Sequence, residues 1–116
     1  MRQDLYVLLI DASEERRVHL ATFLRQKDFV VVAVVGVTQA LSRLQSFHFD
    51  VLIADVTTCG EMLPTLQTAA RTVNTRLFLA ADDERLELTD VRDAKIKKPA
   101  SPSAVFNVLD RRSGQR

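Results

Sequence analysis

Runs of apolar residues with the length of a β-strand recur along the chain, separated by more polar stretches. They cover residues 5–10, 29–35, 49–55, 77–81 and 94–96. The central run, from Phe49 to Asp55, has four apolar residues between two aspartates, which suits a strand buried on both faces. The run at 29–35 is rich in β-branched valine, which favours a strand over a helix. The pattern predicts five short strands, the fifth from its position more than from its composition.

Helical signals lie between these runs. Ser13 can cap a first helix whose first turn is acidic, as the helix dipole favours. Thr38 is expected to cap a short second helix. Pro64 is acceptable only in the first turn of a helix, so it marks the start of a third helix that ends near Val73.

Other segments have less regular patterns. Residues 57–60 are expected to form a loop, and Thr58 has capping-box spacing to Glu61. The stretch 84–92 fits neither the helical nor the strand period, so it predicts a weak or abbreviated helix. A Ser-Pro pair at 101–102 resembles the cap and first residue of a last helix.

The alternation of strands and helices predicts the fold class. It implies a parallel sheet covered on both faces, because right-handed crossovers place helices on each side. The expected architecture is therefore a three-layer αβα sandwich around a five-stranded, doubly wound sheet. Residues 1–110 are expected to form one domain, followed by a polar, frayed tail at 111–116.

Charge and cysteine content exclude several classes of function. The formal charge of +1 offers no electrostatic footprint for nucleic acid or for an anionic membrane. The single cysteine, Cys59, excludes an intrachain disulfide and a multi-cysteine metal site, and it is usual for such a residue to pack rather than react. The longest apolar run, from 29 to 37, is too short to cross a bilayer. These features predict a soluble, cytoplasmic protein.

Three charged residues sit where parallel strands are expected to end. Asp11 and Asp55 end two strands, and Lys98 follows the last strand directly before a proline. The carboxyl ends of parallel strands open onto the crevice where ligands bind, so the three side chains can converge there. Two carboxylates can hold Mg²⁺, and a carboxylate can also accept a phosphoryl group, whose charge a lysine would balance.

These residues resemble the receiver domains of bacterial response regulators in two-component signalling. The resemblance covers nearly the whole chain: the run ending at Asp55 is similar to the family's third strand, and the run ending at Asp11 is similar to its first. It implies a flavodoxin-like sheet with strand order 2-1-3-4-5. It also implies that Asp55 is the phosphoacceptor, that Asp11, Asp55 and the backbone carbonyl of Thr57 bind Mg²⁺, and that Lys98 is the phosphoryl counter-charge.

Other positions depart from the family's pattern. The second member of its acidic pair falls on Ala12, and the hydroxyl residue that ends its fourth strand falls on Ala80. The aromatic residue of its fifth strand falls on Lys95. The segment from Ala80 to Lys98 is a few residues shorter than in the family, so the family's fourth helix, which lies in this segment, is expected to be short or missing. We therefore expect weak Mg²⁺ binding and an impaired conformational switch.

The sequence supports a receiver domain in phosphorelay signalling, not a free-standing enzyme. A histidine kinase or phosphotransfer protein would donate the phosphoryl group to Asp55, and an unknown protein would act downstream; a homodimer is left open. The first alternative is a receiver-like module that works through protein contacts without phosphorylation. The second is a small flavodoxin-like or other α/β enzyme, which the absence of a glycine-rich phosphate loop disfavours.

Each candidate residue also has a simpler structural interpretation. Asp55 could cap the loop that follows it, and Asp11 could cap the first helix beside Ser13. Lys98 could be a solvated surface residue. Glu14 could supply the acid missing at position 12, although a role at the helix dipole is the simpler one.

Overall fold

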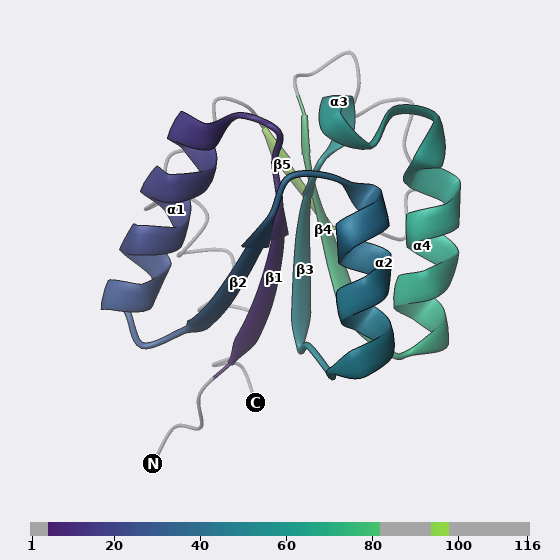
Figure 1. Cartoon of the computed structure of the whole chain (residues 1–116), viewed down its shortest axis with the longest axis horizontal. Coiled ribbons are helices and arrows are strands. Elements are labelled where there is room, and N and C mark those ends of the chain that lie inside the picture. The colour runs from purple at the N-terminus through teal and green to yellow at the C-terminus, as the bar shows by residue number, and fades with distance from the viewer. Residues whose placement is uncertain (1–4, 82–93, 98–116) are drawn as a thin grey trace.

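A computed structural model describes residues 5–81 and 94–97 of the chain. These residues form one parallel sheet with strand order β2-β1-β3-β4-β5, as Figure 1 shows. The strands are β1 (Tyr6–Ile10), β2 (Val30–Val34), β3 (Val51–Asp55), β4 (Arg76–Ala81) and β5 (Ala94–Lys97). All four neighbouring pairs are parallel. The sequence-based expectation of a five-stranded sheet with order 2-1-3-4-5 is confirmed, with strand ends that differ by one or two residues.

Helices cover both faces of the sheet. They are α1 (Glu14–Gln26), α2 (Val37–Ser46), α3 (Val56–Cys59) and α4 (Leu63–Thr72), with a 3₁₀ turn η1 (Gly60–Met62) between the last two. Helix α1 packs on one face, whereas α2, α3 and α4 lie on the other, which gives the three predicted layers (Figure 1). No helix in the described part of the chain is long and apolar enough to span a membrane.

Strand β3 lies at the centre of the sheet, and all five of its residues are buried. Because successive side chains of a strand point to opposite faces, it contributes to two cores. Leu52 packs among α2 and α4 residues such as Leu44 and Leu66. Ile53 packs on the opposite face, where Leu24 of α1 is fully buried. The apolar run that the sequence shows is therefore a strand covered on both sides.

Two of the three expected helix starts are confirmed. The Ser13 hydroxyl accepts a hydrogen bond from the Arg16 N–H at 3.3 Å, as an N-cap residue does, and Pro64 lies in the first turn of α4. The prediction for Thr38 was wrong. The N-cap of α2 is Gly36, two residues before Thr38, so the helix starts at Val37 and has no side-chain cap.

The prediction of a loop at 57–60 was also wrong, because this segment is helical. Asp55 is the N-cap of α3, and its carboxylate accepts a hydrogen bond from the Thr58 N–H at 3.0 Å. Thr58 therefore lies inside a helix and does not start a capping box with Glu61. A carboxylate at the end of a buried strand nucleates one helical turn directly, which local sequence pattern did not reveal.

Two helices end in residues with a left-handed backbone. Asp28 has φ of 74° and Asn74 has φ of 62°, each one residue past a helix C-cap. Short polar side chains tolerate this conformation better than most, although glycine suits it best.

The remaining sequence predictions lie outside the described residues. They are the weak helix at 84–92, the last helix from 101–102, Lys98, and the tail at 111–116. The division into a domain at 1–110 and a tail therefore stays a prediction.

Candidate functional site

Asp11 and Asp55 lie close together at the carboxyl edge of the sheet. Each directly follows one of two paired residues, Ile10 of β1 and Ala54 of β3, so the register of the sheet brings them together. The residues are 9% and 3% exposed, respectively. Two largely buried carboxylates require partners, because an unpaired buried charge is strongly destabilising.

Arg16, in the first turn of α1, provides that partner for Asp11. Its Nε lies 3.0 Å from Asp11 Oδ2 and its Nη2 lies 2.9 Å from Asp11 Oδ1, which is a two-pronged ion pair. The same Nη2 is 3.9 Å from Asp55 Oδ2. The hydrogen bond to Asp11 raises the pKa of the Arg16 guanidinium above its ordinary value, and the charges of both aspartates act in the same direction.

Other groups of the β1–α1 connection also hold Asp11. The Ser13 N–H donates to Asp11 Oδ1 at 2.9 Å, and Arg17 Nη1 donates to the Asp11 carbonyl oxygen at 2.9 Å. Ser13 rather than Asp11 is the N-cap of α1, so Asp11 does not cap the helix as the simpler interpretation proposed but anchors the connection that leads into it. Both of its carboxylate oxygens accept at least one hydrogen bond from the protein.

Thr58 links the two strand ends. Its hydroxyl donates to Asp55 Oδ2 at 2.7 Å and accepts a hydrogen bond from the Ala12 N–H at 3.0 Å. Its own N–H donates to the same Asp55 oxygen at 3.0 Å. The β1–α1 and β3–α3 connections are thus tied together by side-chain hydrogen bonds across the sheet edge.

The structure places the remaining predicted site residues as follows. Thr57 lies within α3, and Ala80 of β4 is the register partner of Asp55. Position 80 is therefore next to the candidate phosphoacceptor, but its methyl group offers no hydroxyl. Lys95 lies in β5, where only the backbone is described, and Lys98 lies outside the described residues.

These residues do not fit a magnesium site as they are arranged. Among residues 5–81 and 94–97, no third His, Cys, Asp or Glu side chain joins Asp11 and Asp55 in a metal-binding group, so these two carboxylates would have to suffice. Mg²⁺ needs oxygen donors, but the oxygens of Asp11 already accept N–H groups from Arg16. A cation about 4 Å from the guanidinium is repelled by about 4 kcal/mol per unit of its charge at an effective dielectric of about 20.

Arg16 is the site residue that the sequence patterns missed. Helical periodicity places it off the apolar face of the first helix, where an arginine is usually solvated. One signal was available: an arginine in the first turn of a helix, five positions after an aspartate that ends a buried strand. The contact depends on how α1 is oriented relative to β1, which brings the Arg16 guanidinium to the Asp11 carboxylate.

Cys59 lies at the end of α3, close to this site, and is 3% exposed. Burial, together with the charge of Asp55, raises the pKa of the Cys59 thiol to about 12. Since the thiolate is the nucleophilic form, Cys59 is an unreactive packing residue at neutral pH.

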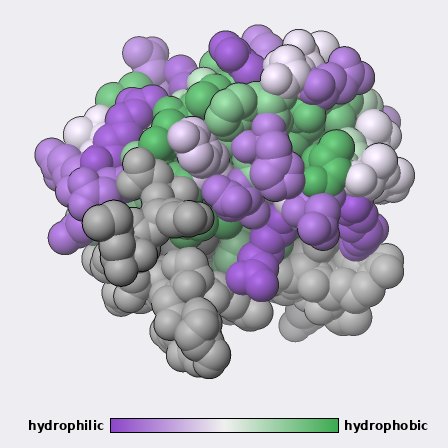
Figure 2. Space-filling view, turned by 90° about the horizontal axis from the view of Figure 1, so that it is seen from below, coloured by the Kyte–Doolittle hydropathy of each residue, from purple (hydrophilic) through white to green (hydrophobic). Residues whose placement is uncertain are grey.

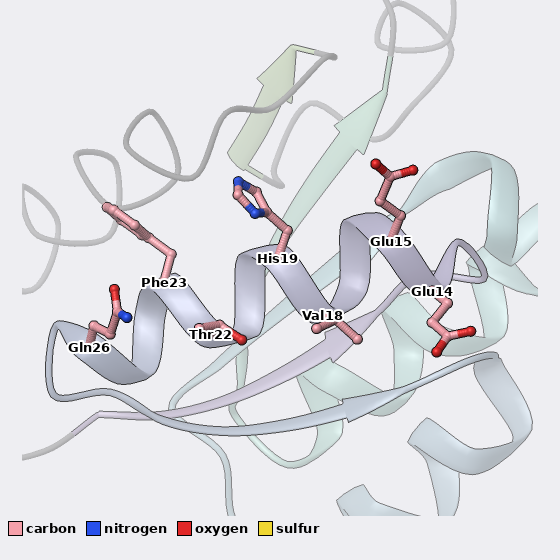
Figure 3. A pocket seen from close by; sticks show the side chains of 7 residues that line it. All are labelled: Glu14, Glu15, Val18, His19, Thr22, Phe23 and Gln26. Carbon is pink, nitrogen blue, oxygen red and sulfur yellow. The ribbon is translucent and has the colours of Figure 1, made fainter.

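A hollow of about 850 Å³ lies elsewhere, along α1. All the described residues that line it belong to this one helix, among them His19 and Phe23, whose side chains point to the same side in Figure 3. Asp11 and Asp55 do not line it, so it is not part of the acidic site.

Apolar side chains are also exposed at the opposite end of the sheet. Tyr6 and Phe47 are 36% and 47% exposed, and their ring centroids are 5.2 Å apart. Figure 2 views this end and shows apolar surface among hydrophilic residues.

No protein-family model and no curated protein sequence matches the chain. Solved structures do match. A response regulator from Thermotoga maritima has a TM-score of 0.82 and 19% identity, with coverage of 97% of this chain and 100% of that chain. A response regulator receiver protein from Sinorhizobium medicae has a TM-score of 0.80 and 17% identity, with 94% of both chains covered.

The chemotaxis response regulator CheY4 of Vibrio cholerae is similar as well, with a TM-score of 0.79 and 21% identity. The match covers 94% of this chain and 98% of that chain. At these identities the similarity establishes the three-dimensional arrangement, and the strand order and helix placement described above agree with it. The chain therefore has the fold of response regulator receiver domains.

Proposed function

We propose that the chain is a receiver-fold signalling module that acts through protein contacts without phosphorylation of Asp55. The observation that carries this proposal is the two-pronged ion pair between Arg16 and Asp11. A receiver-type phosphoryl transfer to Asp55 would need a divalent ion beside that residue. Here the Arg16 guanidinium pairs with Asp11 at 2.9 Å and lies 3.9 Å from Asp55, the two carboxylates that the resemblance gives as ligands of the ion.

Two further positions support the proposal. Ala12 supplies no second metal-binding carboxylate, and its N–H is engaged by Thr58. Ala80, the register partner of Asp55, supplies no hydroxyl to bond a phosphoryl oxygen. Such a charge-assisted hydrogen bond contributes roughly 1.5 to 3 kcal/mol, whereas a nearly complete two-state switch requires about 5.5 kcal/mol. A phosphorylation-driven switch would lack part of that free energy.

Phosphorylation of Asp55 is the second candidate function. It is favoured by the position of Asp55 at the carboxyl end of the central strand, next to Asp11. In this version a histidine kinase or phosphotransfer protein donates the phosphoryl group, Mg²⁺ binds weakly at Asp11, Asp55 and the Thr57 carbonyl, and Lys98 balances the charge. Arg16 would have to leave Asp11 before the ion could bind.

Intact-protein mass spectrometry separates the two candidates. The protein is incubated with acetyl phosphate and Mg²⁺, beside its Asp55→Asn variant and a receiver domain that acetyl phosphate is known to modify. We expect the wild type and Asp55→Asn to stay unmodified while the positive control gains one phosphoryl group. A phosphoryl adduct on the wild type that is absent from Asp55→Asn would reject the proposal in favour of the second candidate.

A further inference from the structure

We propose that Arg16 is a built-in cation that keeps divalent metal ions out of the acidic pair formed by Asp11 and Asp55. This inference rests on the proposed function, because it explains how a receiver fold keeps two buried carboxylates without a metal. It makes Arg16 the residue that determines whether the site accepts a cation. It also implies that the chain is two substitutions, Arg16→Gln and Ala12→Asp, away from a metal site.

The charges at the site support this role. Asp11 and Asp55 carry two negative charges, and Arg16 contacts the first at 2.9 Å and reaches the second at 3.9 Å. Arg17 brings a second positive charge, because its guanidinium donates to the Asp11 carbonyl oxygen at 2.9 Å. These two guanidinium groups reduce the electrostatic attraction that Asp11 and Asp55 would otherwise exert on a divalent ion.

The exposure of the three side chains shows how the guanidinium is placed. The side chain of Arg16 is 54% exposed, whereas those of Asp11 and Asp55 are 12% and 4% exposed. Arg16 is therefore the most solvent-exposed of the three charged groups, and its guanidinium lies within 3.9 Å of both carboxylates. A hydrated ion arriving from solvent meets a positive charge before it reaches an oxygen ligand.

The first turn of α1 fixes Arg16 in this position. The Arg16 N–H donates to the Ser13 hydroxyl, and the Ser13 N–H donates to Asp11. The backbone of Arg16 is thus held by the N-cap residue Ser13, and its side chain is held by the same Asp11 carboxylate that accepts the Ser13 N–H. Preorganisation of this kind reduces the entropy that an arginine loses when it forms an ion pair. The contact is therefore part of the helix start rather than a chance meeting of surface charges.

Ala12 is the second determinant. It lies between Asp11 and the N-cap Ser13, and its side chain offers no oxygen. Mg²⁺ is usually bound by one or two carboxylates together with water and other oxygens, so Ala12→Asp would add a third carboxylate to the same sheet edge. The combined variant removes the competing cation and adds a ligand.

Isothermal titration calorimetry with Mg²⁺ tests the inference directly. It is applied to the wild type, Arg16→Gln, the double variant Arg16→Gln/Ala12→Asp, and Arg43→Gln as a matched control. Arg43 is an exposed arginine of α2, away from the acidic pair. KCl is used to equalise ionic strength. We expect the wild type and Arg43→Gln to bind Mg²⁺ at least about tenfold more weakly than the double variant, and Arg16→Gln to bind more tightly than the wild type.

Thermal unfolding with and without Mg²⁺ covers the case in which a variant folds poorly. A ligand that binds only the folded state raises the midpoint of unfolding, so Mg²⁺ should stabilise Arg16→Gln and the double variant but not the wild type. Arg16→Lys keeps the positive charge while losing the two-pronged geometry, and it should stay insensitive to Mg²⁺.

Two results would overturn the inference. One is an affinity of the wild type for Mg²⁺ that equals or exceeds that of Arg16→Gln. The other is a double variant that folds but neither binds Mg²⁺ nor is stabilised by it. Neither depends on phosphorylation. If the wild type binds Mg²⁺ but gains no phosphoryl group, this inference fails while the proposed function stands. If the wild type gains a phosphoryl group without binding Mg²⁺, the proposed function fails while this inference stands.

Discussion

The hydroxyl of Thr58 donates a hydrogen bond of 2.7 Å to Asp55 Oδ2. The same hydroxyl accepts the Ala12 N–H at 3.0 Å, so one side chain joins the ends of two neighbouring strands. This bridge and the Arg16–Asp11 ion pair lie side by side at the carboxyl edge of the sheet. Together they connect Asp11, Asp55 and the first turns of α1 and α3.

Replacing Thr58 with valine should weaken the fold measurably. The variant keeps the shape of the side chain but leaves the Ala12 N–H without its partner and removes one hydrogen bond from the buried Asp55 carboxylate. We expect a loss of about 1 to 3 kcal/mol in the free energy of unfolding. Urea denaturation measures it. Thr58→Ser, which retains the hydroxyl, should recover most of the loss; equal losses for both variants would contradict the bridge.

Truncating Leu52 should cost more than any surface change. Leu52 is fully buried in the central strand, so Leu52→Ala leaves a cavity between the sheet and the helices on one face. The expected loss is about 2 to 5 kcal/mol in the free energy of unfolding. Val18→Ala is the matched control, because Val18 is 53% exposed and should change stability little. Comparable denaturation midpoints for the two variants would count against the described core.

Replacing Asp28 with glycine should stabilise the protein. Asp28 has φ of 74° just past the end of α1, a conformation that glycine adopts without strain. We expect a gain of up to about 1 kcal/mol, measured by thermal or urea unfolding. Asp28→Ala supplies the contrast and should not stabilise, since alanine lacks both the flexibility of glycine and the local hydrogen bonding of aspartate. A stabilising alanine would show that the backbone there is not left-handed.

Cys59 should make the protein less stable at high pH. The pKa of the thiol is raised from its ordinary value of 9.0 to about 12 in the folded state. Above pH 9 the unfolded chain therefore releases this proton while the folded chain keeps it, and stability falls as pH rises towards 12. The contribution is at most about 1.4 kcal/mol per pH unit. Cys59→Ala removes it, so its stability should decline less steeply above pH 9 than that of the wild type in urea denaturation.

Alkylation gives an independent check on the same residue. Iodoacetamide should leave native Cys59 unmodified at neutral pH and should label it fully once the protein is unfolded in urea, because only the unfolded thiol is accessible and ionisable. Rapid labelling of the native protein would show that Cys59 is exposed or activated.

Much of the fold could be predicted because apolar runs dominate it. A run such as 49–55, with aspartates around four apolar residues, has few alternatives to a buried strand, and its position in the middle of an alternating pattern places it in a parallel sheet. The approach of Asp11 to Asp55 then follows from the register of β1 and β3. The apolar pattern predicts the strands, whereas the strand order that makes β1 and β3 neighbours was implied by the resemblance to receiver domains.

The parts that could not be predicted depend on angles between elements. Helix α3 has only four residues, too few to show a period, and it starts because the Asp55 carboxylate accepts the Thr58 N–H. Arg16 was placed on a solvated face because periodicity reports the direction of the core and not the position of a neighbouring carboxylate. The start of α2 at Val37 likewise reflects the extended backbone of Gly36 and not the capping ability of Thr38.

The central claim is that Arg16 holds Asp11 whether or not Mg²⁺ is present. The most direct measurement is the NMR signal of the Arg16 Nε–H group, assigned by its absence from Arg16→Lys, in solutions with and without millimolar Mg²⁺ at equal ionic strength. Because the Nε–H donates to Asp11 Oδ2 at 3.0 Å, we predict one protected signal at the same position in both solutions. A signal that shifts or disappears as Mg²⁺ is added would show that the ion displaces the guanidinium, and would contradict the account.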